Sequence, residues 1–187
     1  MSWLNLTNEE AARQAGQRVA DLALSEYEAR VPGCGSKYLN HYGVSGSSCT
    51  PFFFWLWERV GRPIHRSAEE VKSFLWVPTM RDVLTLRATG VFFSWRDWDP
   101  RPGDALLVKT KAANKGPGHL AVVGPAGMLI AGPDGKRPGE RYVKTIEAGY
   151  TINKVSNCLA RDSWGEQCTS NRFVTFFRPL WSANKGA

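Results

Sequence analysis

The residues best suited to covalent chemistry lie in a short stretch, residues 46–51 (Gly-Ser-Ser-Cys-Thr-Pro), directly before an aromatic block at residues 52–57. Glycine and serine favour a turn, serine or threonine can cap a helix start, and proline suits the first helical turn. The stretch therefore predicts a helix that begins at Cys49. The positive end of a helix dipole favours a thiolate, which is the nucleophilic form of cysteine. Cys49 is a candidate catalytic nucleophile, and a simply packed cysteine is the other interpretation.

A cysteine nucleophile needs a base within hydrogen-bond reach, most often an imidazole. The chain has three histidines. His41 falls in an expected loop near Cys49, and His65 falls in a linker where exposure to solvent is expected. His119 begins an apolar run of strand length and follows Gly118, which allows a backbone or a substrate to approach closely. We therefore expect His119 to be the base, and a histidine that only caps the strand is the alternative.

Glu147 is the candidate for the group that orients the imidazole and selects its tautomer. It ends a predicted strand, and a neighbouring antiparallel strand would bring it beside His119. A carboxylate exposed to solvent at a strand end is the other interpretation.

The other cysteines are expected to have different roles. Cys34 is a rival nucleophile, but no helix is expected directly after it, so the help of a helix end is absent and we interpret it as a structural or redox-accessible thiol. Cys158 and Cys168 could form a disulfide across a short loop in an oxidising compartment. No CxxC pair occurs and histidine is scarce, so we expect neither a metal site nor a cofactor.

The elements that position these residues change in type along the chain. Helices are predicted at residues 7–30, starting at a capping box, and at 49–60, 67–77 and 79–90, with a polar loop at 35–48. Strands are predicted at 105–108, 119–123, 128–130, 142–147 and 172–178, with a hairpin loop at 109–118 and a turn at 124–127. Helices followed by antiparallel strands predict an α+β fold.

Composition limits the organisation and the partners. The chain has 187 residues and is 43% hydrophobic, which fits one catalytic domain at residues 31–187 with a helical extension at residues 1–30. The net charge of +7 suits an anionic partner, such as an envelope polymer, a lipid or a nucleic acid. No run of five basic residues occurs, which argues against a nucleic-acid arm. We also expect no signal peptide and no transmembrane segment.

The order of these motifs resembles the CHAP family of cysteine, histidine-dependent amidohydrolases/peptidases, which belongs to the papain-like superfamily. The shared order is a cysteine at a helix start, a Pro-Gly-Asp turn at residues 102–104, a Gly-His strand start at 118–119 and a Thr-Ile-Glu strand end at 145–147. Asn40, Tyr42 and Gly43 are similar to the family's Asn-x-Tyr-Gly approach to the nucleophile, and residues 173–179 are similar to its final strand. The resemblance rests on the joint order of short motifs over about residues 30–180.

The resemblance implies a papain-like fold, with helices packed on an antiparallel sheet, and a triad of Cys49, His119 and Glu147. Gly149 stands where many members place an asparagine, so the third member rests on Glu147 alone. Ser48, directly before the nucleophile, also departs from the family pattern.

The resemblance further implies an oxyanion hole formed by the Cys49 N–H and a second donor from upstream. Tyr42 is the first candidate for this donor and the Gly43 N–H is the second. Asn40, Ser48 and Gly118 complete the expected pocket.

The activity implied is hydrolysis of an amide bond of bacterial peptidoglycan by an amidase or endopeptidase, acting as an antibacterial effector or a phage lysin. We expect a monomer that is made in the cytoplasm, binds no nucleic acid, and reaches the periplasm or cell wall by non-classical secretion or lysis. An immunity protein or a carrier of a secretion machine is an expected partner. The alternatives are a protein-directed cysteine peptidase or acyltransferase, and a catalytically silent module that binds glycan or nucleic acid.

Overall fold

The computed structural model describes residues 3–29, 34–75, 80, 84, 90–94, 100–110, 119–130, 133, 141–148, 159–161 and 172–179. The helices are α1 (Trp3–Glu28), α2 (Cys34–Tyr42), α3 (Cys49–Arg59) and α4 (Ala68–Ser73). The strands are β1 (Gly90–Ser94), β2 (Ala105–Thr110), β3 (His119–Ile130), β4 (Arg141–Glu147), β5 (Leu159–Arg161) and β6 (Arg172–Pro179). The helices precede the strands and every strand pair is antiparallel, which confirms the α+β prediction.

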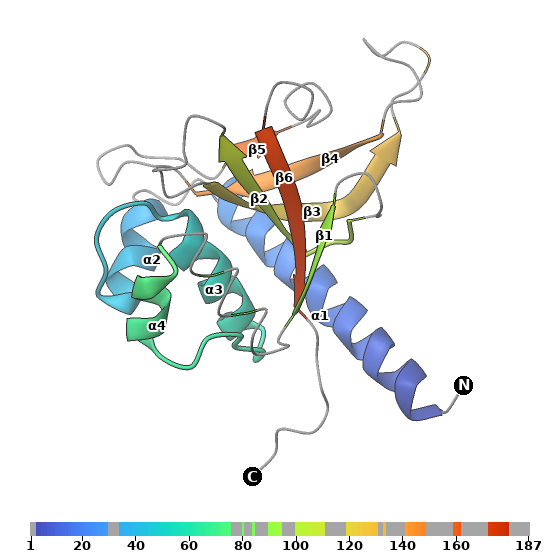
Figure 1. Ribbon diagram of the computed structural model, residues 1–187, viewed down its shortest axis with the longest axis horizontal. Helices are drawn as coiled ribbons and strands as arrows, with labels where there is room; N and C mark the ends of the chain where they lie inside the picture. Colours follow the sequence, from blue (N-terminus) through green and yellow to red (C-terminus); the bar gives the residue numbers. More distant parts are fainter. Residues whose placement is uncertain are drawn as a thin grey trace.

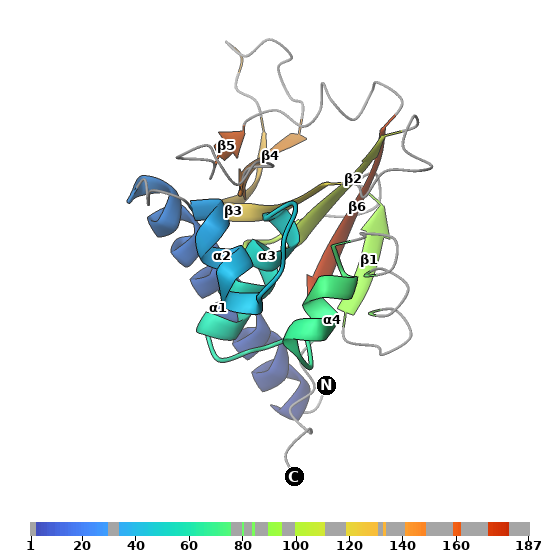
Figure 2. The ribbon, with the colours of Figure 1, turned by 90° about the vertical axis from the view of Figure 1, so that its left-hand side faces the viewer.

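The strands form one sheet in the order β1-β6-β2-β3-β4-β5. The last strand in the sequence, β6, therefore lies between β1 and β2 (Figure 1). Helices α1 and α3 both pack against β3, near the middle of the sheet, and Figure 2 shows α2 and α4 beside α3. None of the described helices is long and apolar enough to cross a membrane.

Helix α3 is the central element of the core. Every residue from Cys49 to Trp57 is buried. The Phe53 ring packs edge-on against Phe177 of β6, with centroids 6.4 Å apart, and the Phe54 ring stacks on Phe74 just after α4, with centroids 5.2 Å apart. Because aromatic side chains bury large apolar areas, these contacts fix α3 between the sheet and α4.

Helix α1 belongs to the same core. Its residues Ala15, Val19 and Ala23 are buried in one hydrophobic cluster with the α3 aromatics. At Gly16 the backbone of α1 touches the turn before β2, where Gly103 has a φ of 81°. A Cβ on Gly103 would lie 2.4 Å from the Gly16 carbonyl oxygen, so both positions need glycine.

The predicted Pro-Gly-Asp turn is present, and its aspartate has a structural role. Asp104 is 2% exposed, and its carboxylate accepts hydrogen bonds from the Arg178 guanidinium at 3.2 and 3.1 Å and from the Arg101 N–H at 2.6 Å. Burial raises the Asp104 pKa to about 6, and Arg178 opposes that rise. The ion pair ties the start of β2 to the end of β6.

Several predicted elements are confirmed to within about two residues. These are α3, β2, β4, β6 and the helix start at Ser67, whose hydroxyl accepts a hydrogen bond from the Glu70 N–H at 3.3 Å. Most of the helix expected at residues 79–90 lies outside the described residues, but Met80 and Leu84 are helical and fully buried. Residues 111–118 of the expected hairpin loop also lie outside them.

Several details of local structure differ from the prediction. The helix expected at residues 67–77 ends at Ser73. Helix α1 begins at Trp3, so the capping box expected at residues 7–10 lies within the helix. The chain after Cys34 forms α2 instead of a loop, because Tyr38, Leu39 and Tyr42 are buried on one side of a helical turn. The turn expected at residues 124–127 is an irregularity inside the continuous strand β3. Strand β1, at residues 90–94, was not expected.

Candidate active site

Cys49 is the first residue of α3 and is 3% exposed. Ser48 occupies the N-cap position, but its side chain makes no capping hydrogen bond. Its carbonyl oxygen accepts from the Phe52 N–H at 2.9 Å, which closes the first helical turn. The positive end of the α3 dipole therefore lies at Cys49.

Two hydroxyl groups lie near the Cys49 thiol. The Ser47 Oγ is 3.2 Å from Cys49 Sγ, and the Thr50 Oγ1 is 4.0 Å from it. A hydroxyl that donates to a thiolate favours the charged form. Cys49 is not in a disulfide.

Ser47 was not among the residues expected at the site. Its position depends on the turn at Gly46, where φ is 117°, a conformation that glycine adopts easily. The available signal was the Gly-Ser-Ser-Cys spacing, which places a hydroxyl two residues before the thiol in a tight turn.

The backbone positions of His119 and Glu147 are defined by the sheet. His119 begins β3 and lies opposite Val108 of β2, whereas Glu147 ends β4 and lies opposite Leu159 of β5. The pairing of Val122 with Ile146 places His119 and Glu147 at the same end of the β3–β4 ladder. Their side chains, and all of Gly118 and Gly149, lie outside the described part of the structure.

The Tyr42 hydroxyl lies at the C-terminal end of α3, opposite the end that begins at Cys49. It donates a hydrogen bond to Glu58 Oε2 at 2.8 Å. Glu58 is nine residues after Cys49, which corresponds to ~13 Å along a helix axis. Burial, followed by the bond to Glu58, raises the pKa of Tyr42 well above its usual range, so the phenol stays protonated. This position argues against the Tyr42 hydroxyl as an oxyanion donor.

The other expected pocket residues upstream of Cys49 have local roles. The Gly43 N–H donates to the Asn40 carbonyl oxygen at 3.2 Å, and Gly43 has a φ of 62°, so this glycine ends α2. Asn40 is exposed on α2. The structure therefore shows the Gly43 N–H engaged in a helix end.

Two histidines differ from expectation. His41 lies in α2, and its Nε2 is 3.1 Å from Glu58 Oε2. The His65 side chain is only 8% exposed, because its ring packs edge-on against Tyr42 and Phe54 with centroids 5.2 and 5.6 Å away. The expectation that His65 is exposed to solvent is wrong.

Cys34 is the first residue of α2. The argument that no helix follows it is therefore wrong, and a helix end alone does not separate the two cysteines. The Cys34 side chain lies outside the described residues, as do Cys158 and Cys168 and their expected disulfide.

Comparisons with known proteins found no match among family models, curated proteins or solved structures. In the described part of the chain, no group of three or more His, Cys, Asp or Glu residues is arranged to hold a metal ion. The chemistry of the site therefore has to be argued from the residues themselves.

Proposed function

We propose that the chain is a papain-like cysteine hydrolase of the CHAP type that cleaves an amide bond of bacterial peptidoglycan. The nucleophile is Cys49, the base is His119, and Glu147 orients the imidazole. The observation that carries the proposal is the packing of α3, which begins at Cys49, against β3, which begins at His119. Strand β4, which ends at Glu147, lies next to β3. The three elements that carry the proposed nucleophile, base and orienting acid are α3, β3 and β4. They are neighbours in space and follow one another in this order along the chain.

The reaction proceeds through a thioester. His119 takes the proton from Cys49 Sγ, the sulfur attacks the amide carbonyl carbon, and the Cys49 N–H donates to the oxyanion. The protonated His119 then gives its proton to the leaving amine as the C–N bond breaks. Water hydrolyses the thioester, again with His119 as the base, and the thiol is restored. Ser47 contributes by holding the sulfur from the turn before α3.

Charge supports the choice of substrate. The chain carries a net charge of +7, which favours an anionic cell-envelope polymer over a neutral one. The enzyme would act as an antibacterial effector or phage lysin in the periplasm or cell wall, after non-classical secretion or lysis. For an effector, the partner class would be an immunity protein or a secretion-machine carrier.

The test is digestion of purified sacculi, with mass spectrometry of the released muropeptides. We expect the wild-type chain to release products and both Cys49→Ala and His119→Ala to lose at least about 1,000-fold in rate, because a nucleophile and its base act as a unit. Cys34→Ala is the matched control and should retain activity. Product release that survives Cys49→Ala would refute the proposal.

Two outcomes of the same experiment would indicate the alternatives. Salt-sensitive retention on sacculi without any product would indicate a binding module. Cleavage of unfolded protein substrates, lost in Cys49→Ala, with intact sacculi would indicate a protein-directed peptidase.

A further inference from the structure

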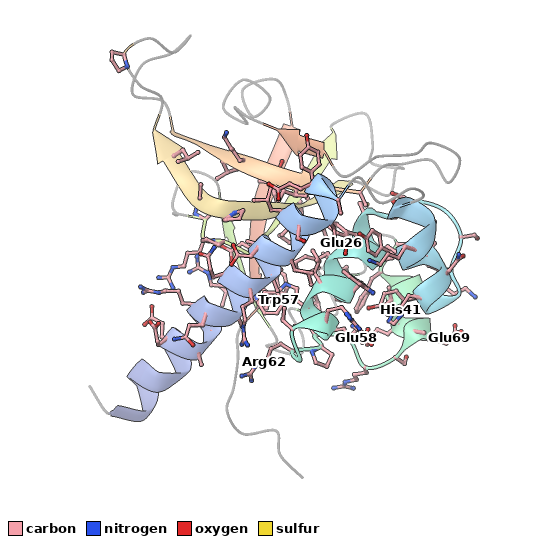
Figure 3. All side chains as sticks on the ribbon, turned by 180° about the vertical axis from the view of Figure 1, so that it is seen from behind. Glu26, His41, Trp57, Glu58, Arg62 and Glu69 are labelled. Carbon is pink, nitrogen blue, oxygen red and sulfur yellow. The ribbon has the colours of Figure 1, made fainter. Side chains whose placement is uncertain are left out.

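A second cluster of titratable groups lies at the end of α3 opposite Cys49. One oxygen, Glu58 Oε2, accepts from the Tyr42 hydroxyl at 2.8 Å, lies 3.1 Å from His41 Nε2 and lies 3.4 Å from His65 Nε2. The four residues come from α2, α3 and the segment between α3 and α4. Figure 3 shows His41 and Glu58 together where α2 and α3 meet. Glu58 thus joins three parts of the helical layer.

The two histidines of this cluster have different environments. The His41 side chain is 39% exposed. The His65 side chain is 8% exposed, and its Nδ1 is buried with no hydrogen-bond partner among the residues that the structure describes. A charge on the His65 ring would therefore lie in a buried site.

We propose that His65 makes the junction between α2, α3 and residues 61–67 sensitive to acid. We call its contacts with Glu58, Tyr42 and Phe54 the latch, because they hold these three segments together and are lost when His65 is protonated. In the neutral ring with its N–H on Nε2, which lies 3.4 Å from Glu58 Oε2, Nδ1 carries only a lone pair. Protonation adds an N–H at Nδ1, which has no hydrogen-bond partner among the residues that the structure describes. A buried charged donor without a partner is strongly unfavourable, so the ring must leave its position for the charge to be solvated. Acid therefore opens the junction.

The charged groups around His65 come from each neighbouring element. Glu58 of α3 and Glu70 of α4 favour its protonated form, whereas His41 of α2 disfavours it, and the neighbouring Tyr42 stays neutral. Burial outweighs the carboxylates, and the pKa of His65 lies below its usual value. For Glu58, burial alone raises the pKa, but the hydrogen bonds from Tyr42 and His41 together with the nearby imidazoles leave it lowered.

The sign of the effect follows from these directions. A histidine with a lowered pKa binds fewer protons in the folded state, so its contribution to stability is complete above about pH 6.5 and is lost as the pH falls through the folded pKa. The lowered pKa of Glu58 acts in the same direction, but only below about pH 4.5. Of these two groups, only His65 therefore titrates in the window between pH 7.5 and pH 5.5.

The latch acts on the turn that holds the candidate nucleophile. Helix α2 leads through residues 43–48 directly to Cys49, and the His65 ring packs on Tyr42 of α2, so departure of this ring loosens that turn. This link to activity rests on the proposed function, whereas the effect on stability does not.

The experiment compares thermal unfolding of the wild-type chain, His65→Phe and His41→Asn at pH 7.5 and pH 5.5. Phenylalanine keeps the ring contacts with Tyr42 and Phe54 but cannot be protonated. Between the two pH values, we expect the wild type and His41→Asn to lose at least about 3 °C more in Tm than His65→Phe. The comparison between variants is needed because Asp104, with a pKa of about 6, titrates in the same range and stabilises the fold as the pH falls. Equal losses in all three chains would overturn the proposal.

A second measurement does not depend on the variant folding. In the wild-type chain, NMR titration of the histidine rings should show His65 titrating below pH 6.5, with the resonances of α2 shifting as it protonates. Titration of His65 at or above pH 6.5, or protonation without any change in α2, would overturn the latch. Neither result depends on whether sacculi are cleaved, so failure of the latch and failure of the proposed activity are distinguishable.

Discussion

Helices α2 and α3 invite comparison because each begins with a cysteine, Cys34 in α2 and Cys49 in α3. The positive end of a helix dipole is present in both, so this feature does not identify a nucleophile. The neighbours differ: α3 packs against β3, whereas the main contacts of α2 are with α3 and α4. The candidate nucleophile is therefore distinguished by the strand that its helix contacts and not by the helix end itself.

The two helices also differ in burial. In α3 every residue from Cys49 to Trp57 is buried, whereas α2 buries Tyr38, Leu39 and Tyr42 and exposes Asn40 and His41. A fully buried helix is held rigidly by packing on all sides. A nucleophile on α3 is thus more firmly positioned than one on α2.

The largest expected effect is a difference in reactivity between the two thiols. At pH 6.5, we expect iodoacetamide to modify Cys49 at least about tenfold faster than Cys34, because the proposed base His119 would take the proton from Cys49 and no such base is proposed for Cys34. The low exposure of Cys49, 3%, opposes this, so a small reagent is needed. Peptide mass spectrometry at a series of times measures both rates in one sample. Faster labelling of Cys34 would mean that the assignment of the nucleophile is wrong.

A smaller effect tests the position of Tyr42. Tyr42→Phe removes a hydrogen bond to the Glu58 carboxylate and should lower the free energy of unfolding by about 2 kcal/mol. Activity on sacculi should stay within about twofold of the wild type, whereas loss of an oxyanion donor costs about 100-fold or more. Urea unfolding and muropeptide release give the two quantities.

Tyr38→Phe is the matched variant for this experiment. It removes the equivalent bond from α2 to Glu26 of α1, which is 2.7 Å long, and should cost a similar amount of stability. If Tyr42→Phe abolished activity and Tyr38→Phe did not, the Tyr42 hydroxyl would have to reach the reacting carbonyl after all.

Local signals in the sequence were sufficient for several elements, including the two that carry Cys49 and Glu147. The Gly-Ser-Ser-Cys-Thr-Pro stretch predicted the start of α3, and apolar runs or alternation predicted β2, β4 and β6, because turn residues and hydrophobic periodicity act within a few residues. For β3 the start at His119 was predicted, but not its continuation through residues 124–127. The prediction of secondary structure failed where contacts between elements determine the local conformation, as in α2. Helix α2 has a polar composition and forms because Tyr38 and Tyr42 reach carboxylates on α1 and α3.

The cluster around Glu58 shows the same limit for side chains. His41, Tyr42, Glu58 and His65 are spread over 25 positions, and no short motif joins them. The burial of His65 depends on rings from two helices, Tyr42 and Phe54, which meet only in the folded chain. A linker histidine was therefore expected to be exposed, and packing placed it in the interior.

The smallest expected effect concerns Ser47, whose hydroxyl lies 3.2 Å from the Cys49 sulfur. A hydrogen bond of this kind contributes roughly 0.5–1 kcal/mol in favour of the thiolate, which corresponds to a change of about two- to fivefold. Ser47→Ala should therefore slow alkylation of Cys49 by about that factor at pH 7 and leave the rate unchanged above pH 10, where the thiol is ionised without help. Ser45→Ala, an exposed serine in the same loop, is the control and should have no effect. An equal slowing at both pH values would mean that Ser47 only shapes access to the sulfur, and the contrast between α2 and α3 would then rest on packing alone.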